Sequence, residues 1–231
     1  HEFGHGLHGR LSDVRYPSLS GTNVPRDFVE FPSQINENWA LEPTVLDNYA
    51  HHVETGEPLP PELVRAVRAQ QQWGQGFSTT EYVAACWLDL AWHRLSPEQA
   101  AKIDDVAAFE ADALEAAGVD LPGIAPRYRS TYFNHIFAGG YSADYWSYLW
   151  AEVLDADGFR AFVDTGAASD TDPVDPGDVR FAGDRFRRMI LSRGATIDYD
   201  DAFWMFRGQQ RSVEPLLERR GLTGADGGQG R

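Results

Sequence analysis

The sequence is poor in cysteine. Cys86 is the only one among 231 residues, so no disulfide can form within the chain. It lies in the apolar run 82–88, where we expect a buried structural thiol and not a nucleophile. A single thiol is compatible with a reducing compartment, and we expect a cytoplasmic, monomeric protein.

Long apolar runs and basic residues are also scarce. No run approaches the roughly 20 residues that a membrane-spanning helix needs, and no signal-peptide pattern opens the chain. The 20 basic side chains are outnumbered by 35 acidic ones, for a net charge of −15. This excess argues against nucleic acid and against an anionic membrane surface as partners. The first residue is not Met, so we expect a fragment that lacks an upstream part.

Apolar residues recur at helical spacing almost everywhere, and strand-like alternation is rare. The fold class that this pattern predicts is all-α. Residues 165–178 are acidic and rich in Pro, Gly and Ser, which indicates an exposed loop. The segment 223–231 is expected to be a disordered tail. The predicted helices cover approximately residues 1–12, 25–39 with a kink or a tight first turn at Pro32, 61–73, 80–95, 96–117, 178–193, 199–207 and 212–219.

The first five residues, His1-Glu2-Phe3-Gly4-His5, read H-E-x-x-H. Residues four apart lie on one face of a helix, so His1 and His5 would aim two imidazoles at a single Zn²⁺. Glu2 beside them could take a proton from a metal-bound water. Two histidines on one helix face are often only a surface pair. The motif by itself leaves a zinc site and a surface pair equally open.

A catalytic zinc site needs a third protein ligand. His8 lies on nearly the same face, but three ligands on one helix give poor tetrahedral geometry, so a supporting or packing role is favoured. The candidates from the next helix are Asp27, Glu30 and Glu37. Glu30 is modestly favoured, because apolar residues flank it and a carboxylate there needs a partner. Asp27 and Glu37 could as easily be solvated.

A second informative stretch combines a Gly-Gly pair at 139–140 with aromatic residues. His135 precedes the pair, and Tyr141, Tyr145 and Tyr148 follow it at helical spacing, which predicts several phenols on one helix face. A phenol O–H and an imidazole N–H could donate hydrogen bonds to the oxyanion that amide hydrolysis creates. The alternative is a group of core aromatics with one polar tip each, and the residues alone favour it.

Four segments stand at a characteristic spacing: HEFGH at 1–5, SGT at 20–22, RDFVEFPSQ at 26–34 and ENW at 37–39. In sequence and spacing they resemble the thimet oligopeptidase family of zinc peptidases, and the similarity continues to about Leu222. The resemblance implies two mostly helical lobes flanking a deep channel. Residues 1–222 would then be the C-terminal catalytic region, and the N-terminal part of the same enzyme would be missing.

The resemblance also implies roles for single residues. The family's Zn²⁺ ligands carry over onto His1, His5 and Glu30, and its catalytic base onto Glu2. The family's substrate-contacting residues, which stabilise the tetrahedral intermediate, carry over onto His135, Tyr141 and Tyr148, and more weakly onto Tyr145.

Further matches at 19–23, 31–37, 126–130 and 190–194 resemble the bacterial dipeptidyl carboxypeptidase branch of the family, whose members release dipeptides from the free C-termini of oligopeptides. Such specificity needs a group that binds the substrate carboxylate. Arg127 and Arg129 are candidates, and a structural salt bridge is an equal alternative. An endo-acting oligopeptidase of the oligopeptidase A or thimet type is the second reading. A non-catalytic helical scaffold is the third.

Overall fold

The computed structural model describes residues 1–169 and 174–223. The predicted all-α class is confirmed for this part of the chain, which contains helices, two isolated β-bridges and no strand. Nearly all of the predicted tail, and the middle of the predicted loop at 165–178, lie outside the described residues. Within the described ranges no helix is both long and apolar enough to cross a membrane.

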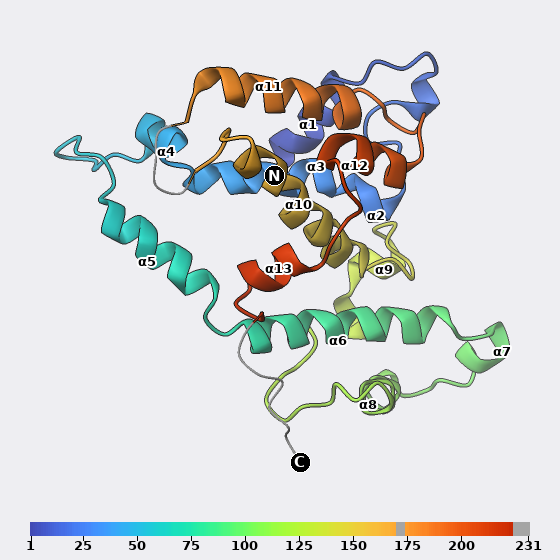
Figure 1. Cartoon of the computed structure of the whole chain (residues 1–231). Helices are drawn as coiled ribbons and strands as arrows, with labels where there is room; N and C mark the ends of the chain where they lie inside the picture. The colour runs from blue at the N-terminus through green and yellow to red at the C-terminus, as the bar shows by residue number, and fades with distance from the viewer. Residues whose placement is uncertain (170–173, 224–231) are drawn as a thin grey trace. The chain divides into compact units, whose positions relative to one another are not determined.

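The chain divides into two compact units. The first consists of His1–Trp73 together with the described residues from Leu149 onward, and the second is Gly74–Tyr148. The α-helices of the first unit (Figure 1) are α1 (Glu2–Arg10), α2 (Arg26–Val29), α3 (Phe31–Glu37), α4 (Pro43–Tyr49), α5 (Pro61–Gln71), α10 (Ser147–Asp164, which begins at the end of the second unit), α11 (Pro176–Phe186), α12 (Tyr199–Arg207) and α13 (Glu214–Arg219). Those of the second unit are α6 (Gln75–His93), α7 (Pro97–Ala100), α8 (Val106–Ala116) and α9 (Asn134–Phe137).

Short helices of other types complete the structure. The 3-10 helices are Pro17–Leu19, Asn38–Leu41 and Ser130–Tyr132, and the π-helix Arg187–Leu191 continues α11.

The core of the first unit is built on phenylalanine. Phe31 of α3 is fully buried and contacts Phe186 and Phe203 edge-on or tilted, at ring-centroid distances of 5.8 and 5.9 Å. Burying a side chain of this size contributes roughly 1.5–3 kcal/mol. Phe31 directly follows Glu30 in the chain, so the core that anchors Phe31 also determines where the Glu30 carboxylate lies.

The core of the second unit surrounds α6 and contains Cys86. The predicted buried thiol is confirmed, since Cys86 is 7% exposed and packs among Ala85, Phe133 and Tyr145. Burial raises the pKa of this thiol to about 12. It therefore stays protonated at neutral pH and is a poor nucleophile.

Helix ends set by local signals agree with the prediction. The helix expected at 199–207 is α12, and the Asp198 side chain accepts hydrogen bonds from the backbone N–H groups of Asp200 and Asp201. A kink or a tight first turn was expected at Pro32, and the structure shows the second, because α2 ends at Val29 and α3 starts at Phe31 with Pro32 in its first turn. Proline suits a first helical turn and cannot continue a preceding helix.

Three predicted helices have other boundaries. The helix expected from residue 80 begins at Gln75, because the left-handed backbone of Gly74 (φ 71°) starts it and Thr80 is an interior residue. The single helix expected at 96–117 is interrupted, since the Asp105 side chain caps a new helix, α8. The helix expected at 178–193 ends as α11 at Phe186 and continues in the π-helix.

Candidate metal centre

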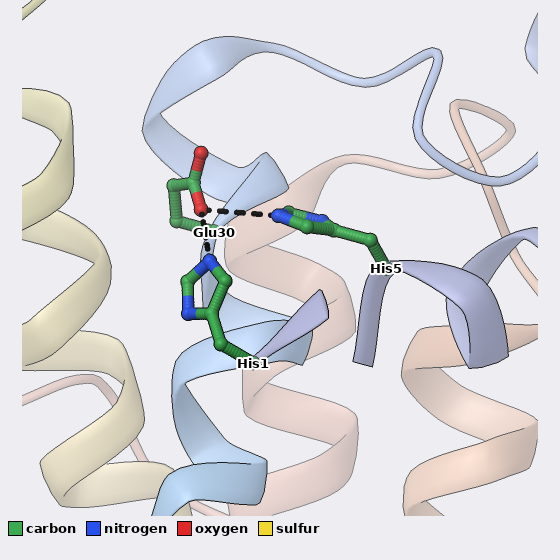
Figure 2. Close-up of side chains that lie close together, drawn as sticks. All are labelled: His1, His5 and Glu30. Carbon is green, nitrogen blue, oxygen red and sulfur yellow. Dashed lines mark ion pairs between the residues drawn. The ribbon is translucent and has the colours of Figure 1, made fainter. Parts of the chain in front are cut away.

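Two histidines and a glutamate converge in the first unit. Nε2 of His1 lies 3.2 Å from Oε2 of Glu30, and Nε2 of His5 lies 3.3 Å from the same oxygen. Figure 2 shows the imidazoles of His1, the residue before α1, and of His5 in α1 pointing at the one carboxylate between α2 and α3. Among the described residues this is the one group of three or more His, Cys, Asp or Glu side chains that could hold a metal ion, with ligand atoms all within 4.8 Å of one another.

Gly4 lets α1 approach α3 closely enough to form this group. A Cβ atom at Gly4 would lie 2.6 Å from Cα of Ser33 and 2.9 Å from the carbonyl oxygen of Pro32. Both distances are shorter than van der Waals contact, and the groups met are backbone, which cannot move aside cheaply. The glycine inside the H-E-x-x-H motif is therefore required by the packing that brings His1 and His5 to Glu30.

The donor set fits a divalent transition metal, and zinc in particular. Two imidazole nitrogens and a carboxylate oxygen are common zinc ligands. Tetrahedral ligands about 2.0–2.2 Å from zinc lie about 3.3–3.5 Å apart. The two nitrogen-to-oxygen distances, 3.2 and 3.3 Å, are close to that spacing. Glu30 is only 4% exposed, and a buried carboxylate is stabilised by a cation held among its neighbours.

Glu37 contacts the other nitrogen of His1. Its Oε1 lies 2.6 Å from Nδ1 of His1, whereas Glu30 faces Nε2. A proton on Nδ1 that is donated to Glu37 leaves the lone pair of Nε2 free for a metal. Burial raises the pKa of Glu37, opposed by the nearby α-amino group and by Arg219. Glu37, weighed above as a ligand or a solvated side chain, is outside the converging group, and its side chain is 56% exposed while it contacts His1.

Replacing Glu37 by alanine is expected to weaken zinc binding by about 10–100-fold, because the His1 ring loses the partner that fixes its orientation and tautomer. The zinc affinity of Glu37→Gln, which keeps an acceptor oxygen, should lie between that of Glu37→Ala and that of the unmodified chain. Competitive titration with a zinc-sensitive dye measures the affinity. Glu62→Ala, an exposed glutamate of α5, is the control. Equal affinities for Glu37→Ala and Glu62→Ala would contradict the orienting role.

His8 and Asp27 are outside the converging group. His8 is fully buried, and neither of its ring nitrogens has a hydrogen-bond partner among the described residues. Burial, assisted by the nearby His5, lowers the pKa of His8 to about 4, so the ring is neutral at pH 7. These features agree with the packing role favoured from the sequence.

Glu2 is exposed on α1, next to His1 and outside the group that converges on Glu30.

The predicted aromatic residues gather around His135 in the second unit. The His135 ring lies 4.9 Å from that of Tyr128, 5.5 Å from that of Tyr145, and 6.3 Å from those of Tyr141 and Tyr148. Tyr141 stacks on Tyr148 at 4.8 Å with an interplanar angle of 19°. The structure thus brings the candidate imidazole and phenols of this stretch together.

The helix predicted to bring these tyrosines together is wrong. Tyr141, Tyr145 and Tyr148 were predicted to share a helix face, but Tyr141 and Tyr145 lie in the non-helical segment between α9 and α10, and only Tyr148 is helical. The backbone of Ala143 has φ of 60°, which no α-helix contains. The rings of Tyr141, Tyr145 and Tyr148 meet because the backbone between α9 and α10 forms a turn.

Burial affects the phenols unequally. Tyr145 is 3% exposed, and burial, reinforced by Tyr128, raises the pKa of its hydroxyl. A phenol with a raised pKa stays protonated at neutral pH, so it can act as a neutral hydrogen-bond donor but does not become a phenolate. Tyr148 is less buried than Tyr141 and Tyr145.

The two arginines considered for a substrate carboxylate have acidic partners within the second unit. Nε of Arg129 forms an ion pair with Glu110, which is 2% exposed. Nη1 of Arg127 lies 3.8 Å from Oε2 of Glu81. Arg129 therefore matches the salt-bridge alternative, since removing it would leave a buried carboxylate without its cation. The pairing of Arg127 is looser and its side chain is 54% exposed.

Sequence reasoning missed Tyr128 and the role of Glu37. Tyr128 stacks on Phe133 at 5.0 Å with an angle of 13° and touches His135. It is seven residues before His135 in an irregular segment, so no periodicity indicates the contact. For Glu37, the available signal was its position seven residues after Glu30, since Glu30 is the N-cap of α3, Glu37 is its last residue, and two helical turns return to the same face.

Comparison with known proteins adds an independent line of support. A profile of peptidase family M3 matches residues 1–222. The dipeptidyl carboxypeptidases of Salmonella typhimurium and Escherichia coli are 46% identical to the chain over 222 and 223 residues, 96% of its length. Oligopeptidase A of Escherichia coli is 38% identical over 226 residues, 97% of the chain. The matched part is 31% of each relative, so the chain spans less than a third of their length.

Proposed function

The chain belongs to peptidase family M3, as its four segments indicated, and we propose that it is the zinc-binding catalytic region of a peptidase that releases dipeptides from the free C-termini of oligopeptides. The chain spans 31% of the relatives' length, so the complete activity is proposed for the longest natural polypeptide that contains these residues.

The observation that carries this proposal is the convergence of His1, His5 and Glu30. Two imidazole nitrogens stand 3.2 and 3.3 Å from one buried carboxylate oxygen, in a chain whose family consists of peptidases. We propose that these three residues hold Zn²⁺ and that Glu37 orients His1. When bound, the metal supplies a Lewis acid that lowers the pKa of water and polarises the scissile carbonyl.

Glu2 is proposed as the group that moves the proton. Its carboxylate accepts a proton from the attacking water while the water oxygen bonds to the scissile carbonyl carbon. As the carbon–nitrogen bond breaks, Glu2 returns that proton to the leaving amine, so it ends the cycle ionised. The exposure of Glu2 beside His1 supports this role, because the carboxylate is free to meet water and the amine.

His135, Tyr141 and Tyr148 are proposed as hydrogen-bond donors to the oxyanion. Their rings form one cluster in the second unit, and a set of pre-positioned donors is what stabilises a tetrahedral intermediate. Tyr145 is more deeply buried than Tyr141 and Tyr148, which supports a packing role for its ring.

Dipeptide release is supported by the relatives, because the two dipeptidyl carboxypeptidases are 46% identical to the chain and oligopeptidase A 38%. Zinc content and cleavage of a matched pair of peptides, with a free or an amidated C-terminus, test the specificity. Dipeptides from the free peptide alone support the proposal, and internal cleavage of the amidated peptide identifies an endo-acting oligopeptidase. If the longest natural polypeptide neither contains zinc nor cleaves either peptide, the remaining reading is a non-catalytic scaffold.

Glu2→Gln is expected to keep zinc and to lower kcat by about 10²–10⁴-fold, the usual contribution of general acid–base catalysis, because the amide cannot take up a proton at neutral pH. Metal analysis and steady-state kinetics of the same preparation measure both properties. Glu62→Gln, an exposed change in α5 with the same loss of charge, should leave both intact. Full activity of the Glu2→Gln protein would remove Glu2 from the mechanism.

A further inference from the structure

A buried carboxylate of α6 binds the backbone of the loop that joins α9 to α10. Asp89 is fully buried, and its Oδ1 accepts a hydrogen bond of 2.9 Å from the backbone N–H of Ala143. Its Oδ2 accepts another of 2.9 Å from the backbone N–H of Tyr145. Nδ1 of His93, one helical turn later, lies 2.8 Å from Oδ1. Both oxygens of one side chain therefore bind amides two residues apart in the loop.

The loop conformation at this point is unfavourable for its residues. Ala143 has φ of 60°, and it is the one non-glycine residue with positive φ in the described part of the chain. Side chains with a Cβ atom rarely adopt this backbone region, so surrounding interactions must hold it. The two bonds to Asp89 lie on Ala143 itself and on Tyr145, and the indole N–H of Trp146 also donates to the carbonyl oxygen of Ala143 at 3.1 Å.

The turn at Ala143 determines how the aromatic rings meet. Tyr141 precedes the turn, Tyr148 follows it, and the two rings stack at 4.8 Å. Between them Tyr145 is held by its N–H on Asp89 and by its carbonyl oxygen, which accepts a hydrogen bond from the Tyr82 hydroxyl. Tyr82 and Asp89 both lie on α6, so two side chains of this helix form hydrogen bonds with the backbone of the turn.

Burying the Asp89 carboxylate in the core costs free energy. Burying a charge without excellent partners is less favourable than burying an apolar side chain of similar size. The Asp89 carboxylate accepts from two loop amides that an apolar residue could not bind, and the Nδ1 atom of His93 lies 2.8 Å from Oδ1 and 2.9 Å from the backbone carbonyl oxygen of Asp89. A carboxylate at this position can therefore hold the loop backbone in one conformation.

We propose that Asp89, oriented by His93, is a positioning residue that holds the turn at Ala143 and thereby sets Tyr141 and Tyr148 for the oxyanion. This assignment rests on the proposed function, in which those two phenols are donors. Asp89 acts through the loop backbone and does not itself touch the reacting atoms.

Amide hydrogen exchange of Asp89→Asn, followed by NMR on this chain, tests the holding of the turn. Asparagine offers one acceptor oxygen and directs an NH₂ group at one of the two loop amides. Exchange at Ala143 and Tyr145 is expected to be about tenfold or more faster, as for loss of a charge-assisted hydrogen bond. The control Asp112→Asn, an exposed aspartate of α8 in the same unit, should leave these rates within about twofold. Unchanged exchange at both amides would overturn the proposal.

Ala143→Gly separates a positioning role from general support of the fold. Glycine adopts positive φ without strain, so the Asp89→Asn, Ala143→Gly double variant should recover about fivefold of the lost protection. Equal acceleration of amides throughout Gly74–Tyr148, unrelieved by Ala143→Gly, would show that Asp89 only stabilises the unit and would overturn the assignment.

Kinetics in the longest natural polypeptide link the turn to catalysis. Asp89→Asn is expected to lower kcat about tenfold or more with KM within about twofold, and Ala143→Gly should restore part of kcat. Faster exchange at Ala143 and Tyr145 without any change in kcat would overturn the catalytic link. Absence of zinc binding and of peptidase activity from the unmodified protein would instead reject the proposed function, and the exchange results would still report whether Asp89 holds the turn.

Discussion

Gly4→Ala is expected to destabilise the first unit by about 1–3 kcal/mol, the usual cost of forcing an extra methyl group into a closed contact. The new Cβ would lie 2.6 Å from Cα of Ser33, so α1 has to move away from α3. His1 and His5 move with α1 while Glu30 stays with the core. Zinc affinity should therefore fall by about tenfold or more, since ligands displaced by a few tenths of an ångström no longer fit one ion.

Gly6→Ala is the matched control, because it makes the same chemical change two residues later on the same helix. A Cβ atom at Gly6 would meet nothing within 4 Å. Alanine in an exposed helix interior is about 0.5–1 kcal/mol more favourable than glycine, so this variant should be more stable than the parent. Urea unfolding with chelator present, and zinc titration, measure the two effects. Equal behaviour of the two variants would refute the close approach of α1 and α3.

Glu30→Gln should weaken zinc binding by more than about a hundredfold. The change removes the anionic ligand, whereas loss of an orienting partner such as Glu37 costs only about 10–100-fold. An amide oxygen is also a weaker donor to a divalent cation than a carboxylate. The measurement is a zinc titration of the purified chain at fixed pH, with far-UV circular dichroism to check that the helices are intact.

Glu42→Gln provides the comparison for Glu30. Both glutamates are buried in the first unit, at 3% and 4% exposure, but Glu42 caps α4 by accepting from the backbone N–H of Val45. Glu42→Gln should cost some stability and leave zinc affinity unchanged. If Glu30→Gln bound zinc as tightly as Glu42→Gln, Glu30 would not be a ligand.

Local signals were sufficient for several helices. Residues 199–207 were predicted as a helix and form α12, because Asp198 caps the start and Gly208 follows the end. Such signals act within a few residues, so they can be read from a sequence. They failed at 96–117, where a continuous helical pattern hides a break. There the Asp105 side chain competes for the backbone and starts a new helix.

The metal centre could be predicted only in part. The spacing of His1 and His5 follows from helix geometry, and it left a zinc site and a surface pair equally open. Glu30 was modestly favoured from its apolar neighbours and assigned by family resemblance. Its selection over Glu37 depends on which nitrogen of His1 each carboxylate faces, Nε2 or Nδ1. That is a property of how α1 crosses α3, and nothing in the local sequence expresses it.

The sequence by itself determined the all-α class, the buried state of Cys86, the histidine pair and the composition of the aromatic stretch, because each depends on periodicity or on residue chemistry. The tertiary structure alone decided three things: the contact at Gly4 that joins α1 to α3, which nitrogen of His1 Glu30 and Glu37 each face, and the hydrogen bonds from the turn at Ala143 to Asp89. Each of these depends on atoms from segments far apart in the chain meeting within about 3 Å, a distance that only packing sets.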